Sequence, residues 1–302
     1  MRIPVPPSPL PDEVVAVAQE YASGARTPVE PRDAATVVLM RDGGAGPEVY
    51  LLLRQTTMAF AAGMAVFPGG GVDARDFDAD LGGARWAGPS AEEWGTRLGV
   101  EPDRARALVC AAVRETFEES GVLLAGATPD EVVADTTGED WEVDREALVA
   151  RDLAFTDFLG RRGLVLRSDL LGVWDAWVTP RFEPRRYRTW FFAAAVPQGQ
   201  RTRDVSTESS SVTWKPATAV LDEVEAGRLA MMPPTYLNCL DVAGHADLSA
   251  ALTSAAGRRA EMFEPRLEPL GEAWTLTMPE RMRAPVAARR AARDASAARD
   301  DA

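Results

Sequence analysis

The feature that most constrains this chain is an acidic turn at the end of a helical sequence, in residues 114–122. Glu115, Glu118 and Glu119 stand at i, i+3 and i+4, a spacing that puts three carboxylates on one helix face. Glu115 and Glu119 form a like-charge pair that destabilises an isolated helix by about 0.2 to 0.5 kcal/mol. Arg114 offsets part of this repulsion if it reaches Glu118 at i+4. The pattern therefore favours a cation among the acids.

A solvated surface face is the alternative, because acidic runs on helices usually face water. The neighbouring sequence favours a metal site instead. Gly121 has the features of a helix C-cap, so two carboxylates lie near the negative end of the helix dipole, where they need compensation. Residues 66–71 read Val-Phe-Pro-Gly-Gly-Gly, a strand end followed by a loop that leaves room for a phosphate. Clustered carboxylates suit Mg²⁺ or Mn²⁺, with water and phosphate completing the shell.

These residues resemble the Nudix box, which reads Gly, five residues, Glu, seven residues, and then Arg-Glu-hydrophobic-any-Glu-Glu-any-Gly-hydrophobic. Residues 114–122 match its second half, with Thr116 where an aliphatic residue is usual. Five residues separate Gly70 from Asp76, which stands instead of Glu, and 37 residues follow it before Arg114. An inserted segment of about 30 residues is therefore expected inside the box. Whether the shorter Asp76 replaces the missing Glu is left open.

An insertion at this point resembles the large coenzyme A diphosphatase branch of the Nudix hydrolases, the peroxisomal animal type and its bacterial relatives. Further likeness to that branch lies in residues 51–70, 177–192 and 212–235. The coenzyme A motif departs in two places: Ala59 stands where a basic residue is expected, and Gln55 where a small one is usual. The resemblance implies metal-dependent hydrolysis of a nucleoside diphosphate derivative. Coenzyme A or acyl-coenzyme A is the leading candidate, and ADP-ribose, NADH and dinucleotides are the alternatives.

A function of another class, a nucleotide-sensing Nudix module without turnover, would also tolerate the insertion and the altered box. The box acids favour an enzyme, because a sensor needs no group that activates water. The resemblance implies that Glu118 and Glu119 are metal ligands and that Glu115 is a third ligand or the base for the attacking water. It also implies that Arg114 holds a carboxylate by a bidentate contact. Substrate binding is expected from the strand and loop before the box: Arg54, which would hold a phosphate, and Gly70 and Gly71, which would let the backbone approach.

Composition restricts the partners more than it defines them. The formal net charge of −13 argues against nucleic acid and anionic membranes, because phosphate backbones need clustered cations. We see no run of about 18 apolar residues and no secretory signal in the sequence, so we expect a cytoplasmic protein. The expected partner is a small nucleoside diphosphate derivative, with a homodimer as a further possibility.

Other reactive side chains favour structural roles. Cys110 and Cys239 lack metal or disulfide spacing and are expected in the core. His245 is the single histidine, and its neighbours do not indicate a catalytic triad. Glu208 is expected to be an exposed loop residue in preference to an additional acidic ligand.

The periodicity predicts both strands and helices, and the resemblance implies an α/β protein with the Nudix α/β/α sandwich and a mixed sheet. Residues 34–40 and 49–54 are expected to form a hairpin, and residues 187–196 an interior strand. We expect an N-terminal helix and extended lead-in at 1–33, a Nudix domain at 34–280 and a flexible tail at 281–302. Within the Nudix domain we expect an inserted helical segment at about 77–106. Helical additions are expected at about 128–170 and 216–256.

Overall fold

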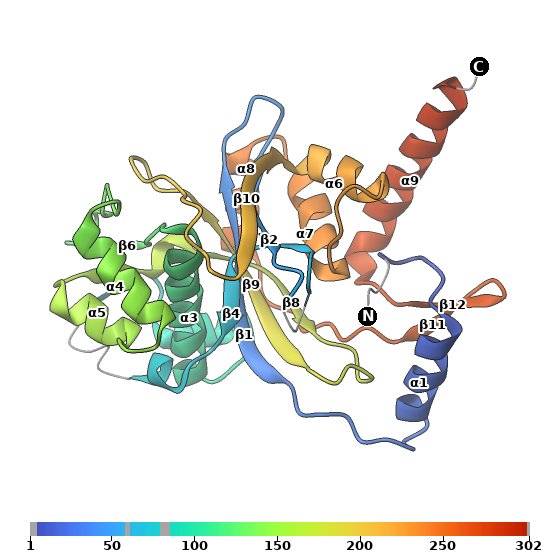
Figure 1. Cartoon of the computed structure of the whole chain (residues 1–302), viewed down its shortest axis with the longest axis horizontal. Coiled ribbons are helices and arrows are strands. Elements are labelled where there is room, and N and C mark those ends of the chain that lie inside the picture. Colours follow the sequence, from blue (N-terminus) through green and yellow to red (C-terminus); the bar gives the residue numbers. More distant parts are fainter. Residues whose placement is uncertain (1–4, 58–60, 79–84, 301–302) are drawn as a thin grey trace.

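A mixed β-sheet forms the centre of the molecule (Figure 1). The computed structural model describes residues 5–57, 61–78 and 85–300, with side chains through residue 295. The main strands run in the order β10-β2-β1-β9-β8, while β3 pairs with β2 and β4 with β1. Their bounds are β1 Arg32–Arg41, β2 Glu48–Arg54, β3 Ala65–Val66, β4 Gly69–Gly71, β8 Gly172–Val178, β9 Tyr187–Ala195 and β10 Ser209–Pro216. The predicted hairpin of β1 and β2 is confirmed, and β9 is an interior strand parallel to β1.

The sheet is buried on both faces because β1 alternates its apolar side chains between two cores. Val37 and Leu39 belong to one core, and Val38 and Met40 to the other. Figure 1 shows helices on both sides of the sheet. The first core is covered by α2 (Ala91–Leu98), α3 (Pro102–Ser120), α4 (Glu139–Val149) and α5 (Phe155–Arg161), and the second by α6 (Ala217–Glu225), α7 (Pro233–Ala243) and α8 (Leu248–Gly257). The predicted α/β/α sandwich and the helices of both additions are confirmed.

The acidic turn lies at the end of α3, the helix predicted from the box. Pro102 stands in its first turn, and Gly121 ends it in the left-handed conformation with φ +74°. The expected insertion contains α2, which starts with the predicted capping box of Ser90 and Glu93. It also contains a strand that was not predicted, and part of the insertion lies outside the described residues. The unpredicted strand is β5 (Arg85–Ala87), which forms a small second sheet with β7 (Val165–Arg167) and β6 (Ala125–Gly126).

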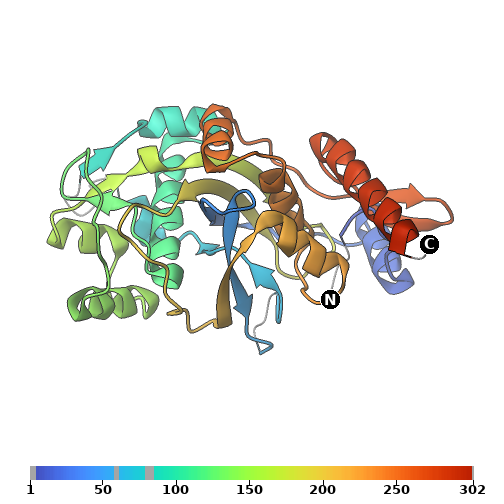
Figure 2. The same cartoon turned by 90° about the horizontal axis from the view of Figure 1, so that it is seen from above.

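The prediction of a flexible tail at 281–302 is wrong for the described residues. The chain forms α9 (Glu280–Asp300), anchored by Met282 and Val286, which are buried beside α7. Ion pairs of Arg281 with Asp175 and of Arg289 with Glu225 add to the two apolar contacts. Figure 2 shows α9, α1 (Asp12–Ala22) and the hairpin of β11 (Leu267–Leu270) and β12 (Ala273–Leu276) at the same end of the molecule. None of the described helices combines the length and the hydropathy needed to cross a membrane.

Candidate active site

A cavity of about 790 Å³ brings the sequence-predicted site residues together. They come from the end of β2, from β4 and from the last two turns of α3: Arg54, Gly70, Gly71, Arg114, Glu115, Glu118 and Glu119. The acidic turn is not a solvated face, because Glu118 and Glu119 are each only 9% exposed. The solvated-face alternative is therefore wrong, and the acids line a concave site.

Arg114 is shared among several carboxylates. Its Nη1 donates to Glu115 Oε1 at 2.7 Å and to Glu118 Oε1 at 3.2 Å. Its Nε and Nη2 donate to the two oxygens of Asp76 at 3.2 and 3.0 Å, and Nη2 also donates to the Gly71 carbonyl at 2.9 Å. The predicted contact between Arg114 and Glu118 is confirmed. The single positive charge of Arg114 therefore offsets the negative charges of Glu115, Glu118 and Asp76 only in part.

Glu119 has weaker compensation than its neighbours. Its Oε2 accepts a hydrogen bond from the Gly69 backbone N–H at 2.8 Å, and it makes no ion pair with any residue that the structure describes. Burial raises the pKa of Glu119 well above its ordinary value, and the charge of Glu115 raises it further. Burial also raises the pKa of Glu118, and that of Glu115 to about 7, against the opposing effect of Arg114. The positive charge of Arg114 is therefore too small to offset the charges of Glu115, Glu118 and Glu119 together.

The glycine loop fits closely against this cluster. A Cβ added at Gly70 would lie 2.5 Å from Oε1 of Glu115, closer than any side chain tolerates. At Gly71 the added Cβ would meet only the Asp33 carbonyl oxygen, at 3.9 Å. A side chain at residue 70 would therefore displace the Glu115 carboxylate from its present position.

Comparison with known proteins agrees with this geometry. The family described as the NUDT19 Nudix domain matches residues 91–241, which is half of the chain. The chain belongs to this Nudix family. The match includes the acidic turn of α3 and the later helices through most of α7, so the predicted resemblance is confirmed.

Named relatives and a solved structure agree with the Nudix assignment. Putative nudix hydrolase 7 of Caenorhabditis elegans is 30% identical over 191 residues, covering 62% of this chain and 52% of that protein. Acyl-coenzyme A diphosphatase NUDT19 of Xenopus laevis is 25% identical over 220 residues, covering 63% and 58%. The chain thus spans little more than half the length of these relatives. A crystal structure of a Nudix hydrolase from Alicyclobacillus acidocaldarius has a TM-score of 0.64 and 28% identity, covering 74% of this chain and 96% of that one.

The altered box of this Nudix protein is completed by Asp76, the residue that sequence left open. Asp76 lies in η1 (Ala74–Phe77), is 2% exposed and binds Arg114 through both carboxylate oxygens. Its side chain also accepts from the Asp73 N–H at 2.8 Å, which fixes the start of η1. Asp76 does not line the cavity. It orients Arg114 from behind and is not placed as a metal ligand.

The donor chemistry of the Nudix site fits a divalent cation, although the side chains do not converge on one point. Three carboxylates with raised pKa values are hard oxygen donors, and the single guanidinium of Arg114 offsets the charge of two of them only in part. Within the described residues, no three His, Cys, Asp or Glu side chains already form a metal-binding group. Two of these acids instead contact Arg114, and the third contacts the Gly69 N–H.

Several residues of the cavity were not predicted. Arg75 and Arg151 lie near the acids, and Arg75 Nη1 donates to the Arg151 carbonyl at 3.0 Å. Glu208 was expected to be an exposed loop residue; its side chain is 51% exposed, but it lines the cavity and pairs with Arg54 at 2.7 Å. Part of the remaining wall comes from segments that were singled out for family resemblance but not predicted to line the site: Trp177, Val178, Thr179, Tyr187, Phe191 and Met232–Thr235. A capping-box pattern at Asp73 and Asp76 was the one signal that could have located η1.

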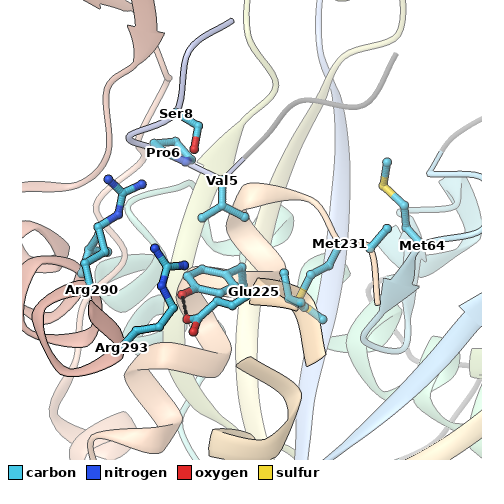
Figure 3. Close-up of a pocket in the computed structure, with 12 residues that line it drawn as sticks. Val5, Pro6, Ser8, Met64, Glu225, Met231, Arg290 and Arg293 are labelled. Carbon is cyan, nitrogen blue, oxygen red and sulfur yellow. Dashed lines mark hydrogen bonds between the residues drawn. The ribbon is translucent and has the colours of Figure 1, made fainter. Parts of the chain in front are cut away.

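A second, smaller cavity of about 340 Å³ lies between the N-terminal segment, α6, α7 and α9. Figure 3 shows Arg290 and Arg293 reaching toward it from α9. Glu225 is the one carboxylate among its described lining residues, and it is already bound by the Tyr236 hydroxyl at 2.6 Å. This cavity therefore lacks a carboxylate cluster. The single histidine and both cysteines lie outside the two cavities, and the cysteines are core residues as predicted.

Proposed function

We propose that this Nudix protein hydrolyses the diphosphate linkage of a nucleoside diphosphate derivative with the help of Mg²⁺ or Mn²⁺. The observation that carries the proposal is a group of three little-exposed carboxylates at the wall of a large cavity. Glu115 and Glu118 share the guanidinium of Arg114, while Glu119 makes no ion pair with any residue that the structure describes. Such a group is stabilised when a doubly charged ion and an anionic substrate bind together. Family membership supports a hydrolase.

The surroundings of each site residue indicate its proposed role. Glu118 and Glu119 are the proposed metal ligands, since both face the cavity. Glu115 is the third ligand or the base, because a carboxyl with a pKa of about 7 exchanges protons near neutral pH. Arg114, held by Asp76, keeps two of these acids in position. A bound divalent ion would offset the negative charge of the diphosphate and make water more acidic.

Coenzyme A or acyl-coenzyme A is the leading substrate. Support comes from the name of the Xenopus relative, an acyl-coenzyme A diphosphatase, and from the apolar side chains that also line the cavity, such as Val66, Phe67 and Phe191. Arg54 is the proposed phosphate-binding residue, because its guanidinium lines the cavity, where it pairs with the exposed carboxylate of Glu208. Gly70 and Gly71 leave the backbone open to the substrate.

A nucleotide-sensing module is the second candidate. It is favoured by the ion pairs of Arg114 with Glu115 and Glu118, because these contacts make the two carboxylates less available to a metal ion. The two candidates differ in whether a divalent ion produces turnover.

The test is a substrate panel. The whole chain is incubated with Mg²⁺ or Mn²⁺ and, separately, coenzyme A, acetyl-coenzyme A, ADP-ribose, NADH and a dinucleoside polyphosphate, and products are identified by mass. We expect metal-dependent release of phosphopantetheine, or its acyl form, together with adenosine 3′,5′-diphosphate. Preference for ADP-ribose or NADH would overturn the substrate assignment. Binding without turnover of any compound would establish the sensor.

A further inference from the structure

Four helices end with the same pair of backbone hydrogen bonds. At the end of α4, the Asp152 N–H donates to the Ala147 carbonyl and the Arg151 N–H to the Leu148 carbonyl, both at 2.9 Å. This is a Schellman motif, which places the residue after the helix cap in the left-handed conformation. The same two bonds end α1, α5 and α6, where the left-handed residues are Gly24, Gly163 and Gly227.

The end of α4 differs from the others in its left-handed residue. Arg151 has φ +62°, whereas the other three positions hold glycine. Space does not explain glycine there, because a Cβ added at Gly163 would meet nothing within 4 Å. Glycine is preferred because its backbone adopts positive φ without a steric penalty. Arg151 therefore weakens the end of α4, and the compensation for it must come from another part of the molecule.

Arg151 lies at the cavity that holds the acidic turn. Its carbonyl is fixed by Arg75 Nη1 at 3.0 Å, and Arg75 is itself held by both oxygens of Asp73 at 2.9 to 3.0 Å. The side chain is exposed and makes no hydrogen bond or ion pair within the described part of the chain. Its charge acts on Glu118, which lines the same cavity. The backbone is thus anchored from two sides while the guanidinium stays uncommitted.

We propose that Arg151 is a substrate-binding residue that holds a phosphate oxygen of the diphosphate beside Glu118. A guanidinium binds phosphate through charge-assisted hydrogen bonds that a neutral side chain cannot supply. This inference rests on the proposed function, because it takes the diphosphate to bind at the acidic turn. The residue comes from the helical addition at 128–170 and not from the Nudix box. The addition therefore supplies a phosphate contact.

A purely structural explanation is that a cation near the C-terminal end of α4 interacts favourably with the helix dipole. The two explanations differ in what Arg151→Gly does to stability. If Arg151 serves the substrate, glycine relieves the backbone and raises the melting temperature by about 2 °C. If Arg151 serves the helix end, glycine lowers it. Gly163→Arg is the matched control for the backbone effect, because it places arginine in the same motif of α5 and should lower the melting temperature by a similar amount.

The experiment measures binding separately from turnover. Adenosine 5′-(α,β-methylene)diphosphate, which resists hydrolysis, is titrated by calorimetry in the presence of Mn²⁺ into the wild-type chain, Arg151→Gly, Arg151→Lys and the surface control Arg228→Gln. We expect Arg151→Gly to weaken binding about 10- to 100-fold, Arg151→Lys to weaken it less, and Arg228→Gln to leave it unchanged. The KM of Arg151→Gly for coenzyme A and for dephospho-coenzyme A should rise by the same factor.

Each outcome supports or overturns the assignment. Unchanged affinity in Arg151→Gly, or a lower melting temperature, overturns it. An effect on coenzyme A that is absent with dephospho-coenzyme A overturns the diphosphate contact, because Arg151 would then hold the remote phosphate. The result is distinguishable from failure of the proposed function. If the wild-type chain binds the methylene compound through Arg151 but hydrolyses none of the substrates, only the hydrolase assignment is overturned. If the wild type shows normal turnover and Arg151→Gly binds as tightly as the wild type, only the inference about Arg151 is overturned.

Discussion

The acidic cavity has two walls of different origin. The inner wall, formed by β4 and the last two turns of α3, presents buried carboxylates around one arginine. The outer wall, formed by η1 and residues 150–153 after α4, presents Arg75 and Arg151. The inner wall is short of positive charge, while the outer wall has a guanidinium to spare. The proposed function makes use of this difference: it assigns the metal to the inner wall and additional phosphate oxygens to the outer one.

The largest effect is expected from neutralising the inner wall. Glu119→Gln and Glu118→Gln should each reduce metal-dependent turnover about 10³-fold or more, because an amide is a poor ligand for Mg²⁺. The fold should survive, since a glutamine at residue 119 still offers an oxygen to the Gly69 N–H. Turnover is measured beside the melting temperature with and without Mg²⁺.

The exposed Glu146→Gln of α4 is the control for loss of one carboxylate, and it should keep full activity. The wild type should gain stability from Mg²⁺, whereas the two inner-wall variants should gain little. Full turnover in both of those variants would remove the proposed site and with it the contrast between the walls.

A smaller effect is expected from crowding the inner wall without changing its charge. In Gly70→Ala the new Cβ meets the Glu115 carboxylate at 2.5 Å, so the acid must move. We expect a loss of turnover of about 10- to 100-fold, in line with the cost of misplacing a catalytic group by about 1 Å. Gly71→Ala is the matched control, because its nearest contact is at 3.9 Å, and it should lose much less. Equal losses in the two variants would argue against the close fit.

The two walls also differ in how far sequence could predict them. The inner wall follows from local rules: helical spacing gathers Glu115, Glu118 and Glu119, and the need for bare backbone beside them identifies Gly70. The glycine that ends α3 followed from the same local rules, whereas the sandwich architecture was implied by the family resemblance.

The outer wall could not be predicted because its contacts join residues that are distant in the chain. Arg75 and Arg151 meet through a hydrogen bond across 76 residues, and Asp76 reaches Arg114 across 38. The hydrophobic periodicity of a sequence carries no information about such contacts. The tail was mispredicted for a related reason: Met282 and Val286 form a docking face only in the presence of α7. An arginine in a position that favours glycine is visible only once the backbone is known.

The smallest effect is expected from pH, and it tests whether the inner wall is short of positive charge. Burial raises the pKa of Glu115 from 4.5 to about 7, so the metal-free folded state binds more protons than the unfolded state between these values. Stability therefore falls as pH rises through this window. We expect the melting temperature of the wild type, relative to that of Glu115→Gln, to be a few degrees lower at pH 7.5 than at pH 5.5. Saturating Mg²⁺ should abolish this difference, because the ion stabilises the charged form. A difference that has the opposite sign would mean that Arg114 already compensates the inner wall, and the metal would then have no electrostatic reason to bind there.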